Sequence, residues 1–157
     1  MEHMKTRTIG LTLAFCFLGA AACLAVDPQI GRWKLNEAKS KITSGTLKNT
    51  QVVCSSMFGQ MKVKSDGIDA SGKPIHIEWS GKFDGKDYPV SGDPNSDTRS
   101  YTKANERTLT TANKKNGKVR VTGQVVISVD GKTRAVTING NTPKGKRFKN
   151  VAVYDKQ

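Results

Sequence analysis

The sequence predicts an all-β protein: a single antiparallel up-and-down β-barrel of about eight to ten strands, with a β-sandwich as the alternative. Three observations support this fold class. Short segments alternate between apolar and polar residues, glycine-containing turn dipeptides separate these segments, and no long apolar run occurs after residue 25. An antiparallel sheet of this length must close or fold over to hide its edge strands, and closure is the simpler solution.

The N-terminal segment has the pattern of a secretory signal peptide. Lys5 and Arg7 form a short basic region, an apolar stretch follows over residues 9–18, and small residues precede Asp27. We therefore expect residues 1–25 to be cleaved near Ala25 and residues 26–157 to form one domain, periplasmic or secreted. Lipidation of Cys23, which follows three alanines, is the alternative and would anchor the protein to a membrane.

The alternating segments predict ten strands. The clearest segment is 74–83, where Ile77, Trp79 and Phe83 share one face and polar residues occupy the other. Between the first two strands, residues 36–42 predict a short helical turn with Asn36 as its N-cap. The expected strands are 30–35, 46–55, 60–65, 74–83, 87–90, 98–103, 108–113, 118–129, 133–139 and 147–154.

Turn signals occur between most of these segments. Residues such as Asn, Asp and Gly tolerate positive φ, so five dipeptides predict turns: Asp66-Gly67, Ser71-Gly72, Asp84-Gly85, Asn116-Gly117 and Asp130-Gly131. The strongest signal is Asp130-Gly131, which is typical of a two-residue hairpin turn. Residues 91–96 form the least regular stretch, whose polarity predicts an unburied loop at a rim. Gly123, on the apolar face of 118–129, predicts a bend or bulge.

The composition describes a strongly basic protein with one cysteine in its expected domain. The chain has 26 Lys and Arg against 13 Asp and Glu, and removal of residues 1–25 leaves 24 against 12, a net charge of +12. Such a surface attracts polyanions. Cys54 is the only cysteine after residue 25, so we expect no intramolecular disulfide and interpret Cys54 as a small buried apolar residue.

Candidate catalytic and metal-binding residues are scarce. His76 is the only histidine after residue 25 and shares a strand face with Glu78, so we interpret it as a surface histidine beside a carboxylate. One histidine and one cysteine cannot supply the ligands of a zinc site of that type, and no Gly-x-Ser-x-Gly elbow presents a nucleophile. We therefore expect no enzymatic activity, no cofactor and no metal site.

Three phrases of the sequence carry a family resemblance: residues 31–40 (GRWKLNEAKS), 83–94 (FDGKDYPVSGDP) and 150–156 (NVAVYDK). Gly31 and Trp33 resemble the Gly-x-Trp strand that opens lipocalin-like barrels. Together the phrases are similar to a largely uncharacterised family of small exported bacterial lipocalin-like β-barrel proteins, over essentially all of residues 27–157. The resemblance implies an exported barrel and carries no established activity or catalytic residue.

Two kinds of binding follow from these expectations. A barrel with small inward residues predicts a cavity for a small, partly apolar or amphipathic ligand; the residues expected to line it are Trp33, Ile77, Trp79, Phe83, Tyr101 and Val121. Alternatively, two basic turns predict contact with anionic envelope lipid or polysaccharide, through Lys114, Lys115, Lys118, Arg120, Lys146, Arg147 and Lys149. Export argues against nucleic acid as a partner, and the sequence predicts no particular oligomeric state.

Overall fold

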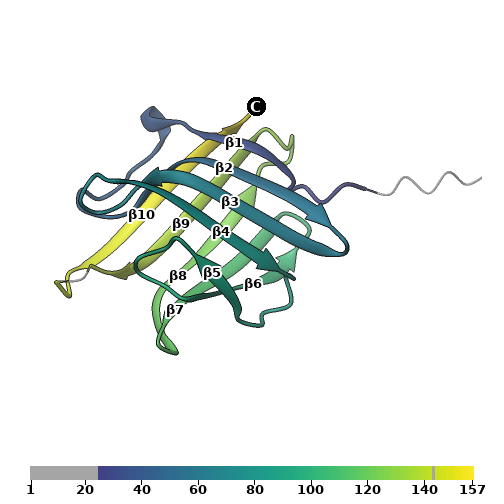
Figure 1. The fold of residues 1–157 in the computed structure, drawn as a ribbon. Coiled ribbons are helices and arrows are strands. Elements are labelled where there is room, and N and C mark those ends of the chain that lie inside the picture. The colour runs from purple at the N-terminus through teal and green to yellow at the C-terminus, as the bar shows by residue number, and fades with distance from the viewer. Residues whose placement is uncertain (1–24, 143) are drawn as a thin grey trace, which may run out of the picture.

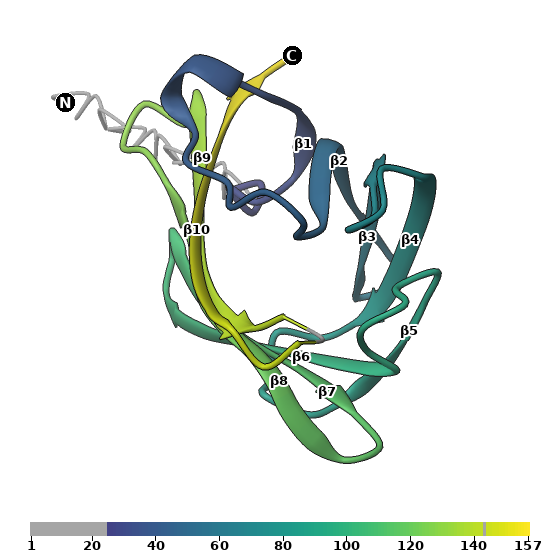
Figure 2. The same cartoon turned by 90° about the vertical axis from the view of Figure 1, so that its left-hand side faces the viewer.

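The computed structural model describes residues 25–142 and 144–157. Ten antiparallel strands close into one barrel in which each strand pairs with its neighbours in sequence and β1 pairs with β10 (Figures 1 and 2). The strands are β1 (Gly31–Leu35), β2 (Lys48–Met57), β3 (Gln60–Ile68), β4 (Pro74–Gly81), β5 (Tyr88–Ser91), β6 (Thr98–Asn105), β7 (Thr108–Lys115), β8 (Lys118–Ile127), β9 (Thr133–Asn141) and β10 (Arg147–Lys156). The expected barrel is confirmed over the sandwich. The expected signal peptide, residues 1–25, lies outside the described part except for Ala25, and so does Cys23, the alternative lipidation site.

Each of the ten expected strands is present, with ends shifted by a few residues. The expected helical turn is a short 3-10 helix, η1 (Glu37–Lys39). Its N-cap is Asn36, whose side-chain oxygen accepts a hydrogen bond from Lys39 N at 3.1 Å. In the described part of the chain, no helix has the length and apolar character needed to cross a membrane.

Of the five turn predictions only Asp66-Gly67 is wrong: Ser71-Gly72, Asn116-Gly117 and Asp130-Gly131 lie in turns, and Asp84-Gly85 lies in the connection between β4 and β5. Asn116 and Gly117 have φ of 51° and 70° and form the expected two-residue turn between β7 and β8. Asp130-Gly131 also lies in a turn, but the connection spans 128–132 and is wider than the expected two-residue hairpin turn, because the Asp130 carboxylate accepts from Lys132 N at 3.0 Å. Asp66-Gly67 lies inside β3, where both residues pair with β4.

Gly123 permits close contact between strands and does not mark a bulge. A Cβ placed there would lie 2.4 Å from the backbone oxygen of Thr137 on β9. The register shift between β7 and β8 falls at Asn113 and Lys114 instead. The absence of a side chain at Gly123 therefore allows the β8 backbone to approach β9.

Alternation of strand direction assigns the connections to two ends of the barrel. The connections that follow β1, β3, β5, β7 and β9 share one end, which we call the mouth. The N-terminal segment before β1 and the connections after β2, β4, β6 and β8 lie at the other, which we call the closed end. Each expected site residue therefore has a defined height along the barrel axis.

Candidate functional site

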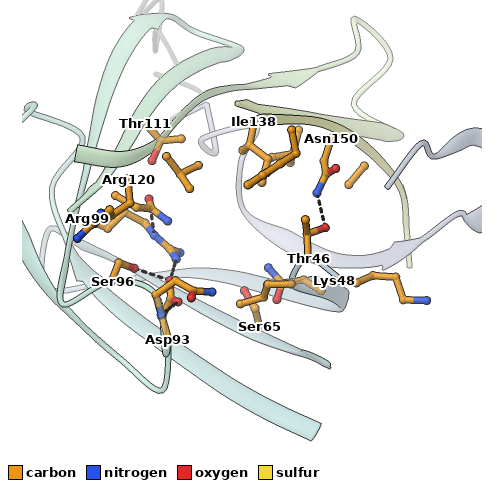
Figure 3. A pocket seen from close by; sticks show the side chains of 18 of the residues that line it. Thr46, Lys48, Ser65, Asp93, Ser96, Arg99, Thr111, Arg120, Ile138 and Asn150 are labelled. Carbon is orange, nitrogen blue, oxygen red and sulfur yellow. Dashed lines mark hydrogen bonds and ion pairs between the residues drawn. The ribbon is translucent and has the colours of Figure 1, made fainter. Parts of the chain in front are cut away.

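The barrel encloses a cavity of about 590 Å³ that opens at the mouth. Its rim includes Thr46 and Asn49 near the start of β2, Asp93 between β5 and β6, and Arg120 at the start of β8. Figure 3 shows Asp93, Ser96 and Arg99 on one side and Thr46 with Asn150 on the other. Deeper in the barrel, the wall is made by inward-facing strand residues, both apolar and polar.

Large side chains fill the barrel toward its closed end. Trp33 and Trp79 are fully buried, and Trp79 packs edge-on against Tyr101 with 4.9 Å between ring centroids. Both indole N–H groups are satisfied, because Trp33 Nε1 donates to Gln29 O at 3.1 Å and Trp79 Nε1 to Arg99 O at 2.9 Å. This end therefore forms a packed floor, and the unfilled volume lies between it and the mouth.

Arg134 lies near the start of β9 and contributes a buried guanidinium to the cavity wall, with 4% of the residue exposed. Its Nη1 donates to Gln29 Oε1 at 3.0 Å and contacts Cys54 Sγ at 3.4 Å, and neither partner is a carboxylate. Its Nε has no hydrogen-bond partner, and no carboxylate of the described residues forms an ion pair with it. Because arginine stays protonated in proteins, the deep end of the cavity carries a positive charge that no carboxylate of the described residues pairs with.

Tyr154 lies opposite Arg134 in the pairing of β10 with β9 and also lines the cavity. Burial raises the pKa of the Tyr154 phenol to about 12. The phenol is therefore neutral at physiological pH and donates to the backbone oxygen of Asn49 at 3.1 Å. Two further buried wall atoms, Asn49 Oδ1 and Thr111 Oγ1, have no hydrogen-bond partner among the described residues.

At the mouth, Asp93 and Arg99 form an ion pair with only 4% and 10% of their side chains exposed. Arg99 Nη2 lies 3.1 Å from Asp93 Oδ2, and Arg99 Nε donates to Asn113 Oδ1 at 3.0 Å. Ser96 also donates to Asp93 and is itself buried. The expectation of an unburied loop at the rim is confirmed for Ser91, Gly92, Pro94 and Asn95, which are exposed. It is wrong for the side chains of Asp93 and Ser96, because Arg99 and Ser96 satisfy the Asp93 carboxylate.

The connection between β1 and β2 is fixed across the opposite side of the mouth by Asn150. Its Oδ1 accepts from Thr43 N at 2.9 Å and its Nδ2 donates to Thr46 Oγ1 at 2.9 Å. A backbone bridge between Lys41 and Val151 adds to this attachment. The rim is thus held by side-chain contacts on two sides and keeps the cavity open between them.

Comparison with solved structures identifies the fold. The barrel is similar to a Schistosoma mansoni fatty acid binding protein in complex with arachidonic acid, with a TM-score of 0.55 and 18% sequence identity, over 83% of this chain and 96% of that one. The chain has a fatty-acid-binding-protein-like, lipocalin-like barrel fold. A redesigned β-barrel, mFAP1, bound to DFHBI also matches, with a TM-score of 0.39 and 15% identity over 83% of this chain and 95% of that one, which is too distant to add to the argument. No protein-family model and no curated protein matches the sequence.

In this lipocalin-like barrel, the residues expected to contact a ligand separate into two groups. Tyr101 and Val121 line the cavity. Trp33, Ile77 and Trp79 are buried but do not line it, and the partly buried Phe83 packs against Trp79 with 6.2 Å between ring centroids. The structure therefore places these four in the packed part of the barrel.

The residues expected to contact anions come together at the mouth. Lys115 and Arg120 line the cavity rim, and Arg120, Arg147 and Lys149 border a shallow depression on the outer side of β8–β10 that also contains Phe148. Lys114 is engaged elsewhere, in an ion pair with Asp87 at 2.6 Å. Lys118 and Lys146 are exposed at the same end.

The sequence interpretation missed the polar residues that distinguish this cavity. Arg134 follows Thr133 at the start of β9, and the alternation of that strand (Arg134, Val136, Ile138) gave the one available signal: an arginine on the inward face. Cys54 is buried as expected, but its contact with Arg134 joins residues 80 positions apart, which no local pattern reveals. The ion pair of Asp93 with Arg99 was missed because the loop was interpreted as fully solvated.

His76 lies on the outer surface of the barrel, away from the cavity. Its Nδ1 lies 2.6 Å from Asp66 Oδ1 and its Nε2 lies 3.1 Å from Glu78 Oε1, as expected for a surface histidine beside a carboxylate. The hydrogen bond with Asp66 and then that with Glu78 raise the pKa of His76. Hydrogen bonds from His76, Lys64 and Lys62 lower the pKa of Glu78 to about 2. Among residues 25–142 and 144–157, no group of three or more metal-ligating side chains occurs.

Proposed function

We propose that this protein is an exported, non-enzymatic carrier that binds a small, partly apolar molecule inside its barrel. The observation that supports this function is the open cavity of about 590 Å³ above a packed floor. Ligand-binding cavities are commonly about 300–1,000 Å³ and combine apolar walls with a few placed polar groups. The wall here has that character, with Val52, Val63, Val125 and Ala152 beside Ser65 and Thr111.

Binding of a neutral apolar dye, N-phenyl-1-naphthylamine, tests this proposal. Thr111 lines the cavity, whereas its neighbour Thr110 on the same strand is exposed on the outer face. We expect the wild type and Thr110→Trp to bind the dye with enhanced fluorescence and Thr111→Trp to lose binding, because an indole would fill the space. Circular dichroism and thermal unfolding confirm that each variant is folded. Absence of dye binding to the wild type, or equal binding by folded Thr111→Trp, would reject the carrier function.

A second candidate function is attachment to anionic envelope lipid or polysaccharide through the mouth. It is favoured by the convergence of two basic turns, which places Arg120, Arg147 and Lys149 around one depression beside the opening. Ion pairing with a charged surface weakens with ionic strength. We expect co-sedimentation with phosphatidylglycerol vesicles at low salt, or with an anionic polysaccharide, that decreases steeply as salt is raised.

Charge-matched variants localise that contact. We expect the triple variant Arg120→Gln, Arg147→Gln, Lys149→Gln to lose vesicle or polysaccharide binding. The control replaces three lysines of the closed-end connections by Gln: Lys82, Lys86 and Lys132. Equal loss in both triple variants would show that net charge alone drives binding and would refute a role for the mouth.

A further inference from the structure

Partnerless polar atoms of the described residues are concentrated in the cavity. Three buried side-chain atoms lack a hydrogen-bond partner: Asn49 Oδ1, Thr111 Oγ1 and Arg134 Nε. All three residues line the cavity. Buried polar groups in folded proteins are normally satisfied by protein or by another molecule, so this cavity wall is built to interact with a polar occupant.

The charges of the residues that line the cavity indicate which kind of polar occupant would fit it. The described residues that line the cavity include five basic side chains, Lys48, Arg99, Lys115, Arg120 and Arg134, and a single acidic one, Asp93. Asp93 is already paired with Arg99, and Lys48 is paired with Glu37 outside the cavity lining. The remaining excess charge is positive, and an anionic occupant would compensate it.

Comparison of the two buried arginines, Arg99 and Arg134, indicates which of them an anionic group would pair with. Arg99 at the mouth has the Asp93 carboxylate at 3.1 Å. Arg134 is at least as buried, and its Nη1 contacts Gln29 and Cys54 but no carboxylate. Since a buried charge without a partner is unfavourable, Arg134 is the residue at which a negative group would be stabilised most.

The surroundings of Arg134 indicate the rest of the molecule. Val136 and Ala152 pair with each other one inward position above Arg134 and Tyr154, and Val125 pairs with Val136 on the other side. These apolar residues line the cavity between Arg134 and the mouth. The wall therefore combines a cation at the deep end with an apolar sleeve above it.

We propose that the ligand of this barrel is an amphiphilic organic acid whose acidic group binds Arg134 at the floor and whose apolar part extends toward the mouth. This inference rests on the proposed carrier function and adds the chemical class and orientation of the ligand. A charge-assisted hydrogen bond is stronger than a neutral one, so Arg134 would select an acid over the alcohol of the same chain.

Competition against N-phenyl-1-naphthylamine with dodecanoate, dodecanol and dodecylammonium tests the proposal. We expect wild-type protein to bind dodecanoate about tenfold to a hundredfold more tightly than dodecanol, the ratio that a hydrogen bond to a charged group provides, and dodecylammonium most weakly. Arg134→Met should retain dodecanol binding and lose the preference for dodecanoate. The control is Arg32→Met, which replaces an exposed arginine of β1 that does not line the cavity and should keep that preference.

The outcomes separate this proposal from the carrier function. If the dye binds but wild-type protein shows no preference for dodecanoate over dodecanol, the carrier function stands and the acid-binding proposal is refuted. Retention of the preference in Arg134→Met, or its loss in the control Arg32→Met, also refutes it. If Arg134→Met does not fold, Arg134→Lys should keep the preference for dodecanoate, and its loss there would be a further refutation. No binding of the dye or of any dodecyl compound would remove the carrier function itself.

Discussion

The ion pair of Asp93 and Arg99 allows a quantitative test of how the mouth is held. Asp93→Asn keeps the size of the side chain and its Oδ1, which accepts from Asn95 N at 2.9 Å. It removes the negative charge opposite Arg99 Nη2, where the two side chains are only 4% and 10% exposed. Breaking a buried pair by removing one partner costs about 3–5 kcal/mol. Because this pair lies at the rim, we expect the lower value, about 3 kcal/mol.

Urea unfolding followed by the fluorescence of Trp33 and Trp79 measures this loss as a change in the free energy of unfolding. Glu106→Gln is the control, because Glu106 pairs with Lys103 while 86% of its side chain is exposed. Such surface pairs contribute about 0–1 kcal/mol. The double variant Asp93→Asn, Arg99→Met should recover part of the stability, since it leaves no unpaired charge. A cost for Asp93→Asn no greater than that of Glu106→Gln would refute the claim that the pair is desolvated.

Three other predictions concern parts of the barrel outside the cavity. Phe58 is 97% exposed and has φ of 50° in the two-residue turn between β2 and β3. Phe58→Asn should stabilise the protein by about 1 kcal/mol in thermal unfolding, because Asn tolerates this conformation; a lower melting temperature would contradict this prediction. The pKa of His76, measured by NMR, should lie above its usual value, so its stabilising effect should be present below about pH 6.5 and lost as the pH rises through the folded-state pKa. Glu78→Gln should lower the pKa of His76, and an unchanged pKa would count against the hydrogen bond between the two side chains. Gly123→Ala should destabilise the barrel by about 1–3 kcal/mol in urea, because its Cβ would lie 2.4 Å from Thr137 O; an unchanged unfolding midpoint would show that β9 can move away.

The fold was predictable because the information for an up-and-down barrel is local. Alternation over 74–81 brings Ile77 and Trp79 inside, and the Asn116-Gly117 turn alone determines how β7 returns as β8. Where a local sequence signal gave a wrong prediction, pairing with a neighbouring strand determined the conformation instead. Asp66-Gly67 has the composition of a turn, yet both residues pair with β4 and extend β3.

The polar residues of the site were not predictable by the same reasoning. Arg134, Gln29 and Cys54 meet at the cavity floor although they come from β9, the segment before β1, and β2. Their proximity depends on closure of the barrel between β1 and β10 and on the register of each pair of strands. Alternation identifies an inward residue, but it does not tell which other inward residues lie at the same height.

The position of each inward residue along the barrel axis explains why a cavity exists. The sequence predicts this position once the direction of each strand is taken into account. Leu109 lies near the start of β7, whereas Trp79 and Ile127 lie near the ends of β4 and β8. In an up-and-down barrel, odd-numbered strands begin and even-numbered strands finish at the same end, so these large residues meet at the closed end and fill it. Thr111 on β7 is small and lies nearer the mouth, where the cavity remains. Bulky residues expected on the cavity wall, Trp33 and Trp79 among them, thus form the floor beneath it, and a ligand entering from the mouth would reach Tyr101 and Arg134 before either tryptophan.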